Sequence, residues 1–280
     1  MTGTMSGTMT GTTPVALLAL AGAIACCAHG QPSVRAYPVP EASALLATLA
    51  TRQAAVRGMN ASARATSWID GTRVRATVNM LIERDGHLRF EAEVRLQGMV
   101  AALATDGTTF TLFDARKNEV NHGPACPANV ASLLRIPLAP ADIAALLLGD
   151  VRLPDGAQPD TQVSWDASRG ADVLAVRTRD GGVLQLMFRG SKEAERALIA
   201  VVRTSASGAR QWQAAFEDLK NVGGVLMPDT IRFAEGKASF DDGVEILFKD
   251  RTLNTPPAAN AFTLATPAGV PVREVGCEDQ

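Results

Sequence analysis

Apolar and polar side chains alternate over most of this chain, and the alternation constrains its fold more than any other feature. In RVRATVNMLIERDGHLRFEAEVRL, residues 73–96, nearly every second residue is apolar on both sides of Asp85-Gly86. A period of two is typical of strands with one buried and one solvated face, and Asp-Gly between two such runs favours a tight hairpin. The sequence therefore predicts long antiparallel strands.

The same alternation extends to both sides of a central interruption. Shorter runs cover residues 99–105 and 109–114, and the pattern resumes after residue 160, with glycine turns at Gly181-Gly182 and Ser207-Gly208. We count about eleven strands. Because no linker or change of composition divides residues 41–280, we expect them to form one α+β domain built on a single large sheet.

An amphipathic helix is expected before the first strand. Leu45, Leu46, Leu49 and Val56 recur at helical spacing within residues 41–57. Such a helix has one apolar face, and we expect that face to cover an edge or a face of the sheet.

Two further helices are expected where the alternation stops in mid-chain. One covers residues 127–134, and the other covers residues 140–148, with Pro140 in its first turn and Gly149 after its end. The second helix is apolar around most of its circumference, so it must be buried on nearly all sides. At about 1.5 Å per residue it is only about 13 Å long, which is too short to span a membrane.

An uncharged apolar run, residues 14–25, precedes the two adjacent cysteines Cys26 and Cys27. A membrane-spanning helix needs about 20 apolar residues, so this run fits the central part of a secretory signal instead. Its end, Ala-Ile-Ala before Cys26, resembles a bacterial lipobox, although the preceding residues contain no Lys or Arg. The resemblance implies a lipoprotein signal peptide over residues 1–25 and acylation of Cys26 with diacylglycerol and palmitate.

A flexible tether, residues 26–40, would then join the anchor to the domain, because this stretch contains three prolines and few apolar residues. Two alternatives stay open for the N-terminus. Cys27 could be the modified residue, although Cys26 would then occupy the small-residue position before the cut. The run could also be an ordinary cleaved signal followed by two cysteines that carry no lipid.

Charge and aromatic content exclude one class of partner. The chain has 27 Lys and Arg against 29 Asp and Glu, so its net charge of −2 gives no reason to expect a nucleic acid. It has nine Phe, three Trp and one Tyr, which are too few to suggest platforms for stacking bases.

The search for catalytic patterns gives little. GxSxG, HExxH, CxxC and phosphate-binding glycine loops are absent from the sequence. Within residues 41–280, His122 and Cys126 are the one place where a histidine and a cysteine approach each other in sequence, as a thiol nucleophile with a nearby base would require. A metal site there would need two further ligands. We therefore expect no enzyme, metal or cofactor, and a Cys/His enzyme is the least favoured alternative.

The order of elements, with one helix, a dominant sheet and a helical insert in mid-chain, resembles the LolA/LolB superfamily of outer-membrane lipoprotein carriers and receptors. The segment RIPLAPADIAALLLGDVRLP, residues 135–154, resembles the Pro-Ile-Pro-Leu stretch, apolar helix and glycine of the LolB group. Within that group the chain resembles most an uncharacterised family of LolB-related bacterial lipoproteins. The resemblance covers about residues 41–250 and implies an unclosed antiparallel β-barrel capped by helices.

A protein of this group would bind the acyl chains of lipids or lipoproteins in a cavity between sheet and lid. We expect the lid to be the helix over residues 140–148, although a fully packed core fits the sequence equally well. A second alternative is a non-enzymatic envelope scaffold or sensor that binds a protein partner through its surface. The residues expected to line the cavity are Phe90, Val94, Leu96, Ile143, Leu146 and Leu147.

One turn is a candidate for contact with the membrane. In LolB, a loop between two early strands carries an exposed apolar residue implicated in handing lipoproteins to the membrane. The corresponding turn here is residues 95–99, so Leu96 or Met99 would play that part. The match departs from the family at Gln97, which lies where the leucine would fall if the glycines are aligned. Both apolar side chains could instead pack in the sheet.

The expected location is the periplasmic face of the outer membrane of a Gram-negative bacterium, through the lipid anchor. The residue after Cys26 is Cys27 and not Asp, which is the usual signal for retention in the inner membrane. Since the periplasm is oxidising, we also expect a disulfide between Cys126 and Cys277. It would pin the C-terminal tail beside the mid-chain helices.

Overall fold

The strands of the computed structural model, which describes residues 33–69 and 72–277, follow the alternation of the sequence. In β2 (Thr72–Glu83), Val78, Met80 and Ile82 are buried, whereas the intervening Thr77 and Asn79 are exposed. The face that the sequence marks as apolar is therefore the face that packs against the core.

Over residues 33–69 and 72–277, fourteen strands form one sheet, and three α-helices lie in the same unit. The helices are α1 (Ala42–Ala55), α2 (Pro127–Leu134) and α3 (Pro140–Leu147). With β2, the first half of the sheet contains β1 (Gly58–Ile69), β3 (His87–Val94), β4 (Gly98–Asp106), β5 (Thr109–Asp114) and β6 (Glu119–Pro124). The second half contains β7 (Gln158–Asp166), β8 (Ala171–Arg177), β9 (Val183–Arg189), β10 (Ala197–Thr204), β11 (Arg210–Val222), β12 (Val225–Glu235), β13 (Val244–Leu253) and the short β14 (Val272–Glu274).

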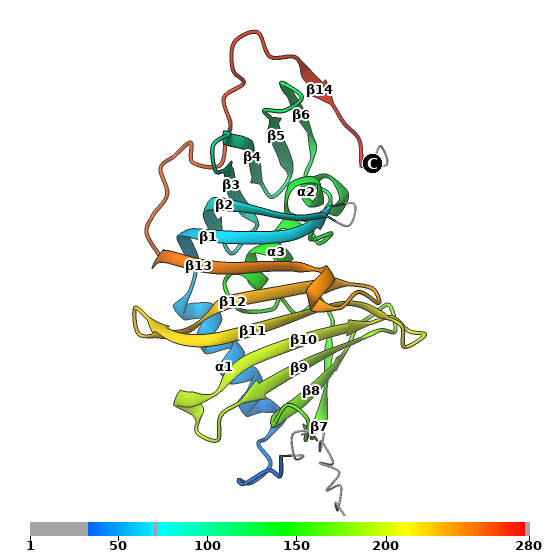
Figure 1. Cartoon of the computed structure of the whole chain (residues 1–280). Coiled ribbons are helices and arrows are strands. Elements are labelled where there is room, and N and C mark those ends of the chain that lie inside the picture. The colour runs from blue at the N-terminus through cyan, green and yellow to red at the C-terminus, as the bar shows by residue number, and fades with distance from the viewer. Residues whose placement is uncertain (1–32, 70–71, 278–280) are drawn as a thin grey trace, which may run out of the picture. The chain divides into compact units, whose positions relative to one another are not determined.

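The sheet consists of two meanders joined by one pair of strands. Its order is β14-β6-β5-β4-β3-β2-β1-β13-β12-β11-β10-β9-β8-β7, so β1 and β13 connect the two halves and the sheet stays open (Figure 1). Neighbouring strands are antiparallel except β14, which runs parallel to β6. This is the predicted unclosed sheet, with fourteen strands where about eleven were expected.

The strands that the alternation did not reveal are β1, β6 and β14. The residues of β1, GMNASARATSWI, include few large apolar side chains, because alanine and serine occupy many of its positions. Gly123-Pro124 ends β6, and such a pair usually indicates a loop. β14 has only three residues, all of them exposed. These strands form because neighbouring strands offer unpaired edges, a cause that lies outside their own sequences.

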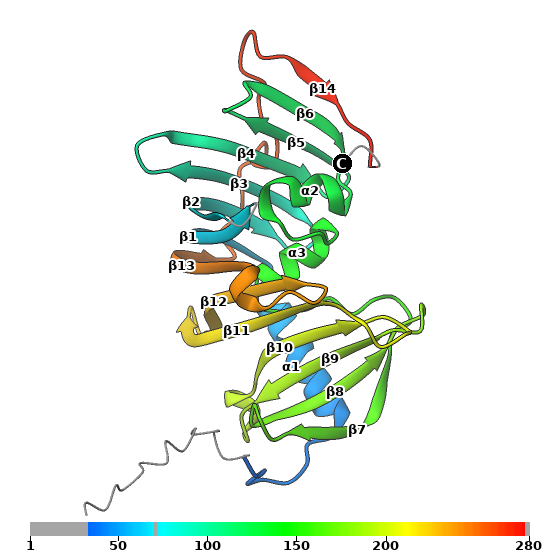
Figure 2. The same cartoon turned by 45° about the vertical axis from the view of Figure 1, so that its right-hand side comes forward.

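Two of the helices lie on one face of the sheet because the chain must pass from β6, near one edge, to β7 at the other edge. β6 lies next to one edge and β7 forms the other, so the connection between them, which contains α2 and α3, passes over the apolar face (Figure 2). Residues of α1, α2 and α3 share one hydrophobic core with the sheet. The three predicted helices are confirmed within two residues at each end. In the described part of the chain, no helix combines the length and apolarity that crossing a membrane requires.

Arg52 of α1 fixes the end of α3. Its guanidinium donates hydrogen bonds to the carbonyl oxygens of Leu148, at 2.8 Å, and Gly149, at 3.0 Å, and a further one to that of Leu226 in β12. A side chain at Gly149 would meet Arg52 Nη2 at 2.6 Å, and its φ of +74° also favours glycine. The glycine after α3 therefore gives Arg52 access to the helix end.

A buried carboxylate, Asp150, lies immediately after this glycine and is fully buried. Arg84 at the end of β2 donates to its Oδ2 at 2.9 Å and also to the carbonyl of Val56 at the end of α1. The backbone N–H of Val151 donates to Asp150 Oδ1, and Gln53 contributes a longer contact at 3.4 Å. The network joins α1, the end of α3 and β2.

Residues 33–40, which we call the N-terminal strap, lie against β7 and β8 and so shorten the expected tether. Arg35 forms an ion pair with Asp172 of β8 at 2.8 Å, and Tyr37 donates to the same carboxylate at 2.9 Å. Asp172 is fully buried, so these two partners compensate a charge that burial would otherwise make costly. Trp165 donates its indole N–H to the carbonyl of Ser33 at 2.7 Å. The chain is thus fastened to the sheet from Ser33 onward.

Removing Arg84 should destabilise the protein in a pH-dependent way. Burial raises the pKa of Asp150 and the Arg84 guanidinium lowers it, so the pKa rises further in Arg84→Ala. We expect a loss of about 3–5 kcal/mol at pH 8, where the unpaired carboxylate is charged. An acid whose pKa is raised by folding binds its proton more tightly in the folded state, so the loss should shrink as the pH falls through that raised pKa.

Urea unfolding at pH 8 and pH 5 measures this difference. The double variant Arg84→Ala/Asp150→Ala is the control, because it removes the charge together with its partner and should unfold with a smaller loss that is similar at both pH values. An equal loss in Arg84→Ala at both pH values would show that Asp150 is not the cause.

Candidate functional site

An apolar pocket with a volume of about 250 Å³ lies between the sheet and helix α2. Strands β1 to β5 and β13 form its wall on the sheet side, and residues 132–135 at the end of α2 form the opposite wall. From β2 it receives Val74, Ala76, Val78 and Met80, which alternate along the strand and therefore lie on one face. At this point the helices leave the apolar face of the sheet partly uncovered.

Small side chains in the sheet explain why the space is not filled. Ala65 of β1 lies opposite Ala76 of β2, and Ala92 of β3 lies opposite Ala101 of β4. All four alanines line the pocket. Closer to the β2–β3 turn, where α3 packs on these strands, the same face carries larger side chains such as Ile82. The pocket therefore arises from alanines at paired positions.

The mouth of the pocket is polar. Asp114 and Arg116 contribute from the end of β5 and the turn after it, and Arg135 contributes from the end of α2. Arg135 has φ 57° and ψ 29°, the left-handed conformation that usually selects glycine at the end of a helix. For a residue with a side chain this conformation costs roughly 1–2 kcal/mol. The pocket thus combines an apolar interior with charged groups at its rim.

Among the six residues predicted to line a cavity, Val94 is the one that lines this pocket. Ile143, Leu146 and Leu147 are at most 2% exposed and belong to the shared hydrophobic core, as does Phe90. Packed side chains therefore occupy the place beneath α3 where the cavity was expected, and the pocket lies beneath α2 instead. α3 is apolar around most of its circumference because most of its residues are buried in the core.

Leu96 and Met99 lie at the hairpin between β3 and β4. Leu96 is 99% exposed, which excludes both cavity lining and packing in the sheet, and Met99 is 45% exposed. Leu96 also has φ +70°, a conformation in which glycine or asparagine is more usual. A large apolar side chain held outward in this way is a candidate for contact with an apolar partner.

The predictions made for the cysteines concern residues that the structure describes and one that it does not. Cys26 lies outside the described residues. Cys126, just before α2, is half-buried with a free thiol. The strand pairing brings the segments before Cys126 and Cys277 side by side, since β14 places Glu274 opposite His122 of β6. A disulfide in the oxidised protein stays a prediction.

His122 has a partner on the neighbouring strand. Its Nδ1 lies 3.1 Å from the hydroxyl oxygen of Thr111 in β5, within hydrogen-bonding distance. His122 Nδ1 is thus engaged across the β5–β6 pair.

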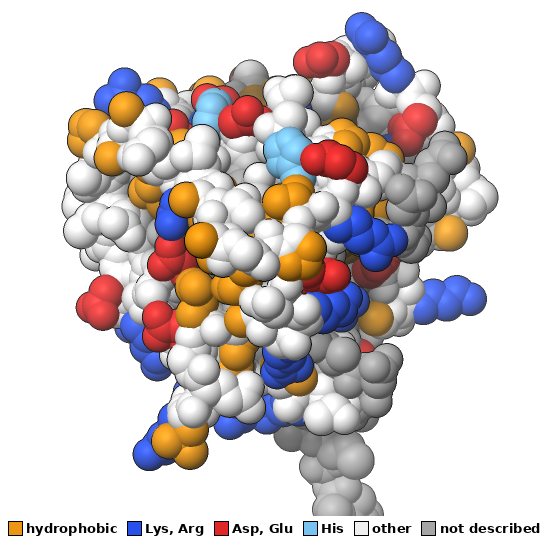
Figure 3. All heavy atoms as spheres, turned by 90° about the horizontal axis from the view of Figure 1, so that it is seen from above, with side chains coloured by type: hydrophobic (Ala, Val, Ile, Leu, Met, Phe, Trp, Pro, Cys, Tyr) orange, Lys and Arg blue, Asp and Glu red, His pale blue; other side chains and the backbone are white. Residues whose placement is uncertain are grey.

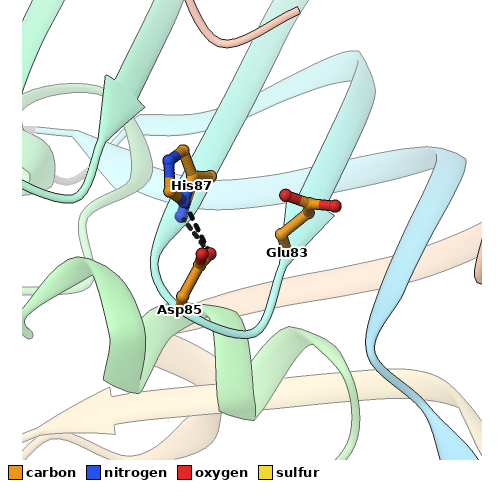
Figure 4. A group of neighbouring side chains, drawn as sticks. All are labelled: Glu83, Asp85 and His87. Atoms are coloured by element: carbon orange, nitrogen blue, oxygen red, sulfur yellow. Dashed lines mark hydrogen bonds and ion pairs between the residues drawn. The ribbon is translucent and has the colours of Figure 1, made fainter. Parts of the chain in front are cut away.

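Glu83, Asp85 and His87 gather at the β2–β3 turn (Figure 4), and one ligand atom from each lies within 4.8 Å of the others. His87 Nδ1 is 2.6 Å from Asp85 Oδ1, and its ring packs on Phe262, with centroids 5.2 Å apart. The group offers three of the four ligands of a usual zinc site. Its observed contacts fasten the turn to the C-terminal segment. In the sequence, this three-residue group is indicated by the spacing i, i+2, i+4 of its members across a tight turn.

The charged surface is mixed in sign. Seen from the end of the sheet that carries β14, Lys and Arg side chains are interspersed with Asp and Glu, and apolar side chains lie between them (Figure 3). This face therefore lacks the extended basic surface that binding to nucleic acid requires.

The solved structures that resemble this chain include the following three. The first is a LolA superfamily protein of Nitrosomonas europaea, with 15% identity, a TM-score of 0.52, and coverage of 80% of this chain and 98% of that one. A domain of Vibrio parahaemolyticus named for outer-membrane lipoprotein sorting has 11% identity, a TM-score of 0.52 and coverage of 78% and 95%. A DUF1329 family protein of Desulfovibrio piger has 10% identity, a TM-score of 0.53 and coverage of 81% and 98%.

These likenesses confirm the LolA/LolB-like fold that the sequence predicted. No protein-family model and no curated protein sequence matches the chain. The identities are low, so the fold is what the chain shares with these structures. The chain is thus a LolA/LolB-like open sheet with an apolar pocket beneath α2.

Substitutions in the two mid-chain helices should separate core from pocket. Leu147→Glu places a carboxylate at a fully buried position of α3, and we expect it to lower the free energy of unfolding by more than about 3 kcal/mol. Leu133→Glu, on the pocket side of α2, replaces a half-buried residue and should have a smaller effect. Urea unfolding followed by circular dichroism measures both, and equal losses would contradict this assignment.

Proposed function

We propose that this chain is a lipid-anchored envelope protein that binds acyl chains of lipids or lipoproteins in the pocket beneath α2. The observation that carries the proposal is an apolar pocket, open at a polar mouth, on the covered face of the sheet. Burial of each methylene is worth about 0.8 kcal/mol, so eight carbons contribute roughly 6 kcal/mol before the entropic costs of binding. Because that gain needs no specific polar contact, the pocket would accept chains of several kinds.

The fold supports this proposal by analogy. One of the structures with the same fold is named for outer-membrane lipoprotein sorting. A fold hosts more than one function, so the pocket and not the fold is the main argument.

The anchor and the hairpin tip complete the proposal. Acylation at Cys26 would attach the chain to the outer membrane on its periplasmic face, with Cys27 permitting export from the inner membrane. The exposed Leu96, with Met99 beside it, would then face the membrane surface and assist transfer of a lipid or lipoprotein. The protein would act as a carrier or receptor without catalysis.

A second candidate function is a non-enzymatic envelope scaffold or sensor that binds a protein partner through its surface. A hollow of about 590 Å³ on the outer face of β9 to β11 favours it. Ile199, Val202 and Leu219 give this hollow an apolar centre, and Arg169, Arg189 and Glu217 contribute to its polar lining. A partner's apolar side chain would fit such a surface.

Filling the pocket should abolish binding of an apolar ligand. Wild-type protein lacking the signal and anchor residues should bind the neutral fluorophore N-phenyl-1-naphthylamine, and decanoate should displace it. Ala76→Phe places a large ring in the pocket and should weaken binding at least tenfold. Thr77→Phe is the matched control, because the next residue of β2 points to the opposite face. If wild type does not bind, the carrier proposal fails and the scaffold alternative stands.

Loss of the anchor should release the protein. In cells expressing the full chain, Cys26→Ala should remove labelling by a palmitate analogue and move the protein from the membrane to the soluble fraction. Cys27→Ala should leave both unchanged. If labelling instead disappears in Cys27→Ala and persists in Cys26→Ala, the lipidated residue is Cys27.

A further inference from the structure

The mouth of the pocket carries two arginines that come from opposite walls. Arg116 follows β5 on the sheet side, and Arg135 ends α2 on the helix side. Both are exposed. Within residues 33–69 and 72–277, neither guanidinium lies within 4 Å of a carboxylate, and neither has a hydrogen-bond partner. Two cations thus flank the entrance with their donors available.

Among residues 33–69 and 72–277, one carboxylate lines the pocket, and it is already engaged. Asp114 Oδ1 accepts the backbone N–H of Arg116 at 2.9 Å and that of Lys117 at 3.3 Å. These bonds hold the turn after β5. Among the described residues, the charged groups that line the mouth therefore sum to one positive charge, and the backbone holds the one carboxylate among them.

The conformation of Arg135 adds a second, independent observation. Glycine would adopt the left-handed backbone conformation at this position without strain, yet the sequence has arginine there. The position ends the helix that covers the pocket, so this backbone geometry places an arginine at the entrance.

The volume limits what enters. If a methylene is given the roughly 30 Å³ that a water molecule takes in the liquid, about 250 Å³ holds a chain of roughly eight carbons. This is space for one acyl chain and not for several. The head group of such a chain would emerge at the mouth, between the two arginines.

From these observations we infer that the pocket takes a single-chain amphiphile with an anionic head group, a carboxylate or a phosphate, that Arg116 and Arg135 hold. The planar guanidinium offers paired N–H donors that match both head groups. The apolar walls next to the entrance strengthen the attraction, since water screens it less there. The inference rests on the proposed function, because it concerns the same pocket, and it adds selectivity for charge.

Displacement of bound N-phenyl-1-naphthylamine at pH 8 tests the inference with four ten-carbon ligands below their micelle concentrations. Decanoate and decyl phosphate should displace the probe at concentrations at least tenfold lower than decanol, and decyltrimethylammonium should be the weakest. The advantage of the anions should shrink in 1 M salt, because the rim is exposed to solvent.

The variant Arg116→Gln/Arg135→Gln should lose at least tenfold in the affinity for decanoate and much less in that for decanol. Lys117→Gln, in the same turn but outside the lining, is the matched control and should bind all four ligands like the wild type.

Equal displacement by decanoate and decanol, or an equal loss of both in the double variant, would overturn the charge selectivity and leave the acyl-chain proposal standing. Preference for decyltrimethylammonium would also overturn it, since Asp114 would then dominate the mouth. If the wild type binds neither the probe nor any of the four ligands, the proposed function itself fails, and the inference with it.

Discussion

A buried carboxylate, Asp150, and the two arginines around it determine how the helices sit on the sheet. Arg84 brings the end of β2 and the end of α1 to this carboxylate, and Arg52 ties α1 to the last carbonyls of α3. Apolar packing has no direction, so it alone would let a short helix shift along the sheet. Hydrogen bonds to a charged group in the interior have direction and are costly to break. The position of α3, and of the segments before and after it, follows from this network.

With α3 fixed, the pocket depends on what the sheet presents to α2. Beneath α3 the sheet and helix side chains are buried together in one core. Beneath α2, the paired alanines of β1 to β4 are each shorter by several methylenes than a large apolar side chain. The sheet side of the pocket is therefore deeper there. One continuous apolar face therefore serves as a rigid core at one end and as a binding surface at the other.

Much of the fold could be predicted because the strongest signals are local. The alternation in residues 73–96 is a property of the strands themselves, and Pro140 and Gly149 mark a helix by their own backbone preferences. The pocket could not be predicted in the same way. Ala76 is informative only once Ala65 is known to lie opposite, which is a matter of register. The apolarity of α3 was also ambiguous, since a lid and a core helix share it, and burial of Leu147 on every side shows that it is core. The strap residues gave no signal, because their partner Asp172 is 135 positions away from Tyr37.

The N-terminal strap has a mechanical meaning if Cys26 carries the lipid. Only seven Cα–Cα steps separate Cys26 from Ser33, which is fastened to the sheet, and they reach at most about 25 Å when fully extended. The length of this tether is smaller than the width of the protein's own sheet, whose fourteen described strands at about 4.8 Å per strand span roughly 60 Å. A domain on so short a tether would stay close to the surface of the membrane that holds its anchor. Any cargo would have to come to it by diffusion or be delivered by a second, unanchored molecule.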